Sequence, residues 1–262
     1  MNISLSAEPI FHIGSFPVTN SLINSFLAVI FFVTLALVFR QTKIKSVPKG
    51  LQNVLESIID FLLGYLDQVT HNRKKSEKFL PLVATLFIFV LFSNWLGQLP
   101  GTGTIGLWEE HHGQTVLVPF LRPATSDINT TLALAVFAII ATHVFGIITI
   151  GFFKHANKFV NLAGIWKSVK LRKPIGFFVA FVEFFVGLIE IFSEIAKMAS
   201  LSLRLFGNIF AGEVLLTVLA SLIAYFVPLP FMFLELLVGF IQATIFAMLT
   251  LVFLEVATAE HH

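Results

Sequence analysis

Long apolar stretches alternate with short polar segments along the chain. They run from about Leu22 to Phe39, Phe79 to Leu96, Leu132 to Phe153, Ile175 to Val227 and Phe231 to Val256. Because about 20 apolar residues cross the roughly 30 Å of bilayer hydrocarbon, each stretch has the length of a membrane span. The pattern predicts an all-α membrane protein with about five transmembrane helices, in a single membrane domain over residues 1–262.

The segment from Leu51 to Thr70 has a different pattern. Its apolar residues recur at helical spacing, and polar residues such as Gln52, Glu56 and Asp60 lie between them. A helix with one apolar and one charged face rests at a membrane surface more readily than it crosses the membrane. We therefore predict an interfacial amphipathic helix over residues 51–70.

The stretch from Ile175 to Val227 is too long for one upright span. Its roughly 53 residues would make about 80 Å of helix, more than two bilayer thicknesses. Six polar residues in it are separated by 7, 4, 3, 7 and 4 positions: Glu183, Glu190, Glu194, Lys197, Arg204 and Asn208. At 100° per residue they fall within about 80° of arc, a phase that a break would destroy. We predict one long helix, then a turn at Val227-Pro228-Leu229-Pro230.

Composition agrees with a membrane location. The chain is 56% apolar and only 12% charged, against roughly 25% charged residues in a soluble domain. The net charge of +2 is too small to indicate a nucleic-acid partner. Since the chain has no cysteine, a disulfide-stapled exterior domain is excluded.

Lysine and arginine are sorted by segment. Residues 1–21, 40–78, 97–131 and 154–173 carry none, eight, one and six of them. The positive-inside rule then places residues 1–21 outside and the two basic segments in the cytoplasm. The first nineteen residues lack the basic region of a cleavable signal peptide, so the first span is expected to be retained. Five spans place the C-terminus in the cytoplasm.

Arg204 is an arginine at bilayer depth. Such a residue costs about 2.5–3.5 kcal/mol on insertion scales, so it requires a polar or wet partner. Its guanidinium stays protonated and acts as a fixed positive charge, never as a proton carrier. A carboxylate beside it is favoured in the ionised form, whereas a carboxylate moved into lipid is favoured protonated. The residue fits a proton-release device, and a structural ion pair with a neighbouring helix is the alternative.

Three more polar residues lie in the last part of the chain. Glu213 follows Arg204 by nine residues, half a turn out of phase and roughly 13.5 Å along the axis, so the two face opposite sides. Glu235 and Gln242 are seven residues apart and share a face of the last helix. These residues fit a water-filled half-channel in which Glu213 and Glu235 exchange protons. The alternative is a hydrogen-bonded protonated pair with no transport role.

The stripe of the long helix fits a second path, open to the other side of the membrane. Glu183, Glu190 and Glu194 would line it, although Lys197 has the reach to pair with Glu190 or Glu194. His143 lies in the middle of its span. Two interpretations fit it equally well: a proton-transfer site, or a core histidine whose ring nitrogens are hydrogen-bonded.

No metal or cofactor is predicted. The adjacent pairs His111-His112 and His261-His262 lack the spacing of a metal site. Small residues, which let another helix approach closely in lipid, cluster around Arg204 instead: Ala196, Ala199, Ser200, Ser202, Gly207, Ala211 and Gly212. They indicate packing against helices outside this chain, or ordinary packing within it.

Two other classes of protein remain possible on these residues. A self-contained secondary transporter would bind an anionic substrate at Arg204, but it would also have internally repeated halves with interrupted helices, and the sequence has no such repeat. A structural membrane scaffold would not need six polar residues in phase on one helix.

The run from Ser200 to Glu213, SLSLRLFGNIFAGE, closely resembles the signature of subunit a of F-type ATP synthases. The similarity extends over most of the chain, including residues 79–95, 127–132 and 242–252, whereas the first forty residues match only in character. Position 235 departs from the histidine of some bacterial members.

The resemblance implies a proton-conducting stator subunit that is not catalytic alone. The long helix and the last helix, residues 175–256, would form a tilted hairpin against a rotating ring of subunit c, with the ring near Ser200, Gly207 and Ala211. Arg204 would separate two offset aqueous half-channels and deprotonate each ring carboxylate. By the same resemblance, Glu213, Glu235 and Gln242, with Asn208 nearby, map to the exterior half-channel, and Glu190 maps to the other.

The resemblance also implies partners and a location. Subunit b, the other synthase subunits and membrane lipid are the expected partners, and proton flow would drive rotation and ATP synthesis. A bacterial plasma membrane is the favoured location, and an organellar origin stays open.

Overall fold

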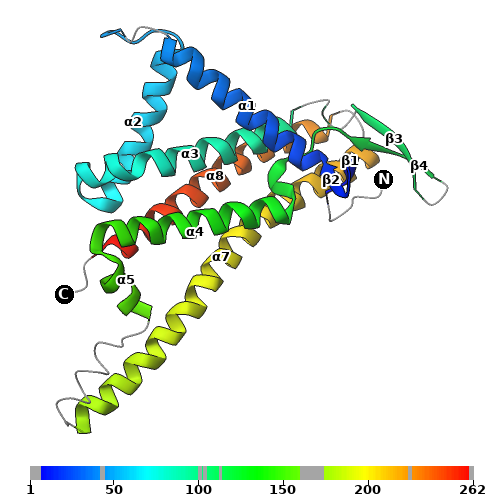
Figure 1. Ribbon diagram of the computed structural model, residues 1–262. Coiled ribbons are helices and arrows are strands. Elements are labelled where there is room, and N and C mark those ends of the chain that lie inside the picture. Colours follow the sequence, from blue (N-terminus) through cyan, green and yellow to red (C-terminus); the bar gives the residue numbers. More distant parts are fainter. Residues whose placement is uncertain are drawn as a thin grey trace.

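The computed structural model describes residues 7–41, 45–99, 102, 105–111, 114–159, 174–223 and 226–259 (Figure 1). Its long helices are α1 (Asn20–Gln41), α3 (Arg73–Gly97), α4 (Ile128–Ile150), α7 (Pro174–Leu222) and α8 (Pro228–Thr258). Its shorter elements are α2 (Leu51–Thr70), α5 (Phe152–Phe159), the 3₁₀ turn η2 (Ala124–Ser126), and strands β1 (Pro9–Ile13), β2 (Phe16–Thr19), β3 (Gly106–His111) and β4 (Gln114–Pro119). Within the described residues, five helices are long and apolar enough to cross a membrane, which confirms the expected fold class.

The helices pack as a bundle around α8. Helix α8 lies between α3 and α4, α7 packs on α4 and α8, and α1 packs on α3. The core is formed by apolar side chains from α2, α3, α4, α7 and α8, among them Leu66, Phe79, Ala138, Leu205 and Phe246. Lys75 Nζ, 2.8 Å from Glu255 Oε1, also joins the start of α3 to the end of α8. The predicted helix at 51–70 is present as α2, and its place at the membrane surface stays a prediction.

Helix α7 is unbroken over 49 residues, as the phase of its polar stripe predicts. At 1.5 Å per residue it is roughly 74 Å long, and its first part extends beyond the rest of the bundle (Figure 1). Helix α8 begins at Pro228, so Pro228-Leu229-Pro230, predicted as part of the turn, form the first turn of this helix instead. Of the apolar, membrane-spanning residues of α7 only 11% are buried, against 39% of those of α8. One side of α7 is therefore left open by this chain.

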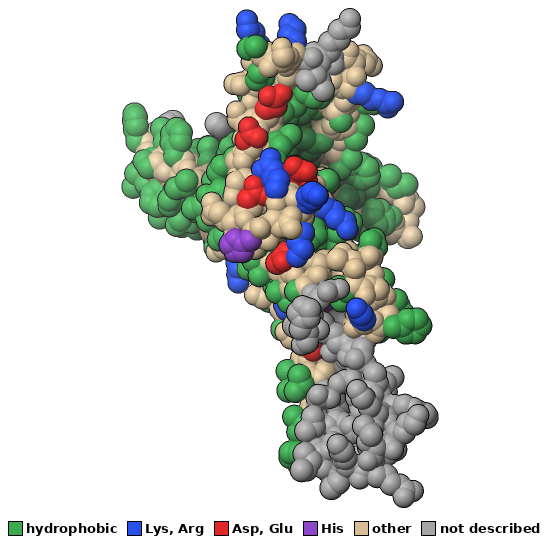
Figure 2. Space-filling view, turned by 90° about the vertical axis from the view of Figure 1, so that its left-hand side faces the viewer, with side chains coloured by type: hydrophobic (Ala, Val, Ile, Leu, Met, Phe, Trp, Pro, Cys, Tyr) green, Lys and Arg blue, Asp and Glu red, His purple; other side chains and the backbone are tan. Residues whose placement is uncertain are grey.

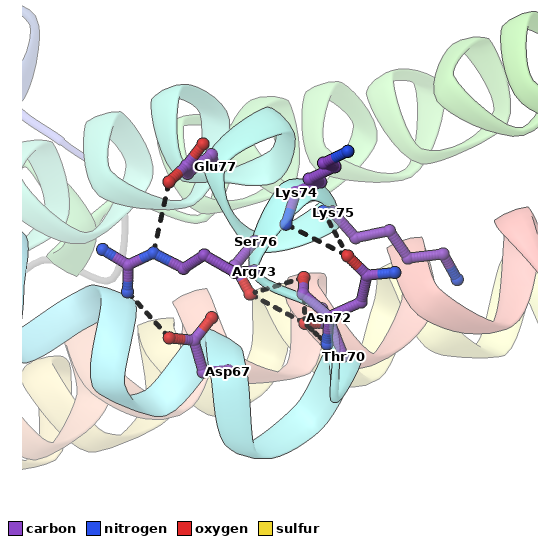
Figure 3. Close-up of polar contacts among 8 residues, drawn as sticks. All are labelled: Asp67, Thr70, Asn72, Arg73, Lys74, Lys75, Ser76 and Glu77. Atoms are coloured by element: carbon purple, nitrogen blue, oxygen red, sulfur yellow. Dashed lines mark hydrogen bonds and ion pairs between the residues drawn. The ribbon is translucent and has the colours of Figure 1, made fainter.

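Helix α3 begins six residues before the apolar stretch that predicted it. The Asn72 side chain accepts hydrogen bonds from the backbone N–H groups of Lys74 and Lys75, at 3.0 and 3.4 Å, and so caps the helix in its polar part. Arg73 then pairs with Asp67 of α2 at 2.7 Å and with Glu77 at 3.2 Å (Figure 3). These contacts extend the helix beyond its apolar stretch and fix the α2–α3 turn.

Helix α4 spans residues 128–150, whereas the apolar pattern predicts residues 132–153. It starts earlier because the Asp127 side chain accepts from the backbone N–H of Asn129 at 3.0 Å. It ends earlier because Gly151 has a φ of +88°, a conformation that other residues rarely adopt. Phe152 and Phe153, predicted as the end of this span, belong instead to the separate helix α5.

Two β-hairpins lie at one end of the bundle, opposite the α2–α3 turn (Figure 1). Strand β1 pairs with β2, and β3 pairs with β4 in a register from Gly106↔Pro119 to His111↔Gln114. The sequence predicts only a polar turn region between α3 and α4, but the run Thr115-Val116-Leu117-Val118 is rich in β-branched residues, which favour strands. The C-terminal residues 260–262, for which a cytoplasmic location is predicted, lie outside the described residues.

Candidate proton-conducting site

Polar residues at the start of α1 hold the segment that leads from β4 into α4. Asn24 Nδ2 donates to the carbonyl oxygens of Arg122 at 2.7 Å and Ser93 at 3.3 Å, in a fully buried position. Ser21 Oγ donates to Asp127 Oδ2 at 3.1 Å. These contacts tie side chains of α1 to the backbone and to a carboxylate of that segment. Arg122 is therefore placed by α1 and α3 together.

Arg122 forms a buried ion pair with Glu213. Its Nε lies 2.9 Å from Glu213 Oε1 and 3.0 Å from Oε2, and the Arg122 residue is only 4% exposed. Breaking such a pair by removing one partner costs about 3–5 kcal/mol, because an uncompensated charge stays buried. Arg122 thus has an anionic partner within this chain, Glu213.

Glu235 lies directly beside this pair. Gln98 Nε2 donates to Glu235 Oε2 at 3.0 Å, and the Glu235 residue is 6% exposed. Its carboxylate rests against the backbone of Gly212, where any Cβ would overlap it. Gln242 is buried two turns further along the same face of α8. Arg122, Glu213, Glu235, Gln98 and Gln242 are called the hairpin-side cluster below.

Arg204 lies on the side of α7 that faces away from the bundle. Its Nη2 donates only a long 3.5 Å hydrogen bond to Ser200 Oγ, and among the described residues no carboxylate pairs with it. The alternative of an ion pair within the chain thus has no support in the described residues. The exposed residues around Arg204, called the open face below, are Ser200, Leu203, Gly207, Asn208 and Ala211.

The opposite side of the same helix turn is packed. Leu201, Ser202, Leu205 and Ile209 are each no more than 2% exposed. Ser202 Oγ lies 3.1 Å from Thr131 Oγ1 of α4. The helix therefore turns apolar and small polar groups toward the chain and Arg204 outward, while Glu213 points back into the bundle as the helical phase predicts.

A second polar cluster lies toward the end of the bundle opposite the β-hairpins. Lys197 Nζ is 2.7 Å from Glu194 Oε1, and His143 Nε2 is 3.6 Å from Glu194 Oε2. His143 Nδ1 is 3.2 Å from His155 Nε2 of α5. With Glu190 these residues line one small cavity. His143, His155, Glu190, Glu194 and Lys197 are called the α5-side cluster below.

The sequence-predicted site residues thus fall into three groups. Glu213, Glu235 and Gln242 lie in the hairpin-side cluster, Glu190 and His143 in the α5-side cluster, and Arg204, Asn208, Ser200, Gly207 and Ala211 on the open face. The side chain of Glu183 lies outside the described residues.

Sequence reasoning missed three members of the clusters: Arg122, Gln98 and His155. Arg122 carried a signal, because it is the one basic residue in the segment between the second and third apolar stretches. Such an isolated cation, on the side where the positive-inside rule disfavours it, suggests a specific anionic partner. Gln98 and His155 carried no signal of comparable strength.

Comparisons with known proteins identify the family of this chain. A family model described as ATP synthase A chain matches residues 22–255. The chain is 33% identical to ATP synthase subunit a of Moorella thermoacetica over 246 residues, 94% of this chain and 93% of that protein. It is 35% identical to that of Mycobacterium ulcerans over 252 residues, 93% and 90% of the two chains, and 30% identical to that of Trichlorobacter lovleyi over 260 residues, 99% and 96%. The chain therefore belongs to the family of ATP synthase subunit a, the membrane proton-channel subunit of F-type ATP synthases, which has no catalytic site of its own.

Proposed function

We propose that the open face of α7 contacts a rotating ring of subunit c and that the two polar clusters are the proton paths to and from this ring. The observation that carries the proposal is the exposed, unpaired guanidinium of Arg204 on a membrane-spanning helix. Facing lipid, it would cost about 2.5–3.5 kcal/mol or more. A partner surface with acidic groups removes this cost, and the small residues Gly207 and Ala211 let that surface approach closely.

Arg204 then acts on each ring carboxylate by its charge alone. A protonated carboxyl that leaves the lipid and comes beside the guanidinium is favoured in its ionised form, so it releases its proton. The same fixed charge repels protons and keeps the two paths apart. Along α7, Glu213 lies nine residues beyond Arg204 and Glu190 fourteen before it, roughly 13.5 and 21 Å away. The paths are thus offset along the helix on either side of Arg204.

In the hairpin-side cluster, we assign the proton-carrying role to Glu235. Glu213 forms an ion pair with the buried Arg122, so protonating it would give up the attraction between these two charges. Glu235 has an uncharged donor, Gln98, as its hydrogen-bond partner, and no cation within ion-pair distance among the described residues. It can therefore gain and lose a proton without that penalty. Gln242 extends the polar face of α8 beyond it.

The distribution of basic residues supports an orientation for the two paths. Residues 40–78, which contain α2 and its two connections, and residues 154–173 after α4 carry fourteen of the 17 Lys and Arg residues, eight and six, whereas the segment with β3 and β4 carries only Arg122. Figure 2 looks onto the α2–α3 end and shows Lys and Arg side chains gathered there with Asp and Glu. By the positive-inside rule this end faces the cytoplasm, with the hairpins outside.

In ATP synthesis, protons would enter by the hairpin-side cluster, load the ring carboxylates, and leave by the α5-side cluster after rotation. The further partners are the other synthase subunits, including subunit b, and the lipid of a bacterial plasma membrane. The side chains of Asn208 and Ser200, one turn from Arg204 on the open face, supply polar groups beside the passing carboxylates.

Gly207→Trp is expected to stop ATP-driven proton pumping in vesicles containing the complete synthase. Apart from the adjacent backbone of α7, no atom of the described residues lies within 4 Å of a Cβ at position 207, so the indole extends from the open face into the space assigned to the ring. Gly64→Trp on α2, which also meets nothing within 4 Å, is the matched control and is expected to pump normally. Normal pumping by an assembled Gly207→Trp complex would contradict a ring on this face.

A further inference from the structure

We propose that His143 and His155 form a two-histidine proton relay that connects the cavity beside Glu190 to the surface next to α5. The inference rests on the proposed function, because it names the groups that carry protons through the α5-side cluster. Within that cluster, His143 and His155 are the proton-carrying residues, and Glu194 is a counter-ion that positions His143.

The two imidazoles lie in series. His143 uses one ring nitrogen, Nδ1, to contact His155 Nε2 at 3.2 Å, and its other nitrogen, Nε2, faces Glu194 Oε2 at 3.6 Å. The two rings meet edge to face, with centroids 5.4 Å apart. Imidazole is the side chain that can take a proton at one nitrogen while releasing another from the second nitrogen. His143 is therefore placed as a bridge between α7 and α5.

The space on the two sides of His143 differs. On the α7 side, His143 and His155 line a cavity of about 10 Å³ with Glu190, Glu194 and Lys197, which is room for about one water molecule. On the other side, the same two histidines line a hollow of about 240 Å³ together with Ile147, Phe152 and Ala156. The histidine pair thus separates a small polar cavity from a larger hollow at the protein surface.

Opposite charges beside His143 partly cancel, which suits a group that passes a proton on. Its titratable neighbours among the described residues are His155 on α5 and Glu190, Glu194 and Lys197 on α7, while α8 contributes only Phe253, Val256 and Ala257 to the cavity. Lys197 pairs with Glu194 at 2.7 Å and so keeps that carboxylate charged. The carboxylate attracts a positive imidazolium, and Lys197 offsets part of the attraction.

One transfer is balanced in protons. Water in the cavity gives a proton to Nε2 of His143, and the proton on Nδ1 passes to Nε2 of His155. Because Nδ1 of His155 is buried beside Gly146, His155 releases the proton it received from Nε2 itself, toward the hollow that the ring also lines, once the ring turns away from His143. His143 finishes with its proton on Nε2, and a turn of its ring restores the starting tautomer.

Gly146 supplies a way to disturb the relay without removing either imidazole. A Cβ at this position of α4 would lie 2.7 Å from Cε1 and 2.8 Å from Nδ1 of His155, and 3.0 Å from the carbonyl oxygen of Ala257. The ring is the movable neighbour, so Gly146→Ala is expected to push it away from His143.

The test compares ATP-driven proton pumping by the complete synthase in vesicles as a function of pH on the side from which protons enter the α5-side cluster. We expect His143→Ala and His155→Ala to lower the rate on the alkaline side of the profile by roughly tenfold, less than the loss of an irreplaceable acid–base group because water can partly take over. Added imidazole is expected to restore much of the rate. Gly146→Ala should show the same alkaline loss, and His12→Ala, which removes an exposed imidazole on β1, should match the wild type.

Two results would overturn the relay. One is a wild-type rate and profile for His143→Ala. The other is a loss that is equal at every pH and that imidazole does not restore, which would make the histidines structural. Neither result touches the role of Arg204, because an Arg204→Ala complex measured in the same vesicles reports on the proposed function separately.

Discussion

Arg204→Ala is expected to reduce ATP-driven proton pumping to background in vesicles containing the complete synthase. The side chain has no carboxylate partner among the described residues, so its removal breaks no ion pair that they contain. What disappears is the fixed charge that would ionise each arriving ring carboxylate. Without it, a carboxyl that enters protonated leaves protonated, and rotation is no longer coupled to proton release.

Two further variants test whether the effect of Arg204→Ala is specific to the guanidinium at this position. Arg204→Lys keeps a positive charge but loses the planar fork of donors, and its stem places the charge differently, so a large loss is expected here as well. Arg40→Ala at the end of α1 removes an exposed arginine elsewhere and is expected to pump normally. Wild-type pumping by an assembled Arg204→Ala complex would refute the role of this residue.

Glu235→Gln is expected to lower proton flux through the membrane sector by at least about tenfold, since a group that transfers protons directly contributes roughly 10²–10⁴-fold in rate. The amide keeps the size and the hydrogen-bonding contact with Gln98 but cannot carry a proton. Flux per assembled complex, measured with a pH-sensitive dye across the vesicle membrane, reports the loss. The double variant Glu213→Gln, Glu235→Gln is expected to be at least as slow.

Glu213 is expected to respond differently. Glu213→Gln removes the ion pair with the buried Arg122, so it is expected to lower the amount of assembled protein. Combining it with Arg122→Gln also removes the buried cation and is expected to recover assembly, with flux above that of Glu235→Gln. If the double variant Glu213→Gln, Arg122→Gln is slow and Glu235→Gln is fast, the two glutamates have the opposite roles.

The helical architecture was predictable because it rests on local patterns. Apolar stretches of membrane length predict the spans, and the common phase of Glu190, Lys197 and Arg204 predicts that α7 continues without a break. The half-turn offset between Arg204 and Glu213 also predicts their opposite directions, because helix geometry alone decides it. Helix ends were less predictable, since the caps at Asn72 and Asp127 lie outside the apolar stretches and the positive φ of Gly151 ends a helix inside one.

The contacts of the clusters were not predictable from one sequence. Arg122 and Glu213 are 91 residues apart, and the pairing depends on how α1 and α3 hold the segment before α4. His155 lies in a short polar helix whose position depends on the turn at Gly151. The strands of the two hairpins are also short, and the strand preference of four to six residues is weak without a partner strand.

The most direct test of the ring contact is cross-linking from the open face. The chain has no cysteine, so Gly207→Cys introduces its single thiol, beside Arg204. In a complete synthase whose subunit c carries a cysteine near its carboxylate, oxidation is expected to join the two subunits and to stop rotation until the disulfide is reduced. Ile140→Cys on α4, which is 56% exposed, should give no such product. Equal cross-linking from position 140, or none from position 207 in a complex that still pumps, would contradict a ring facing Arg204.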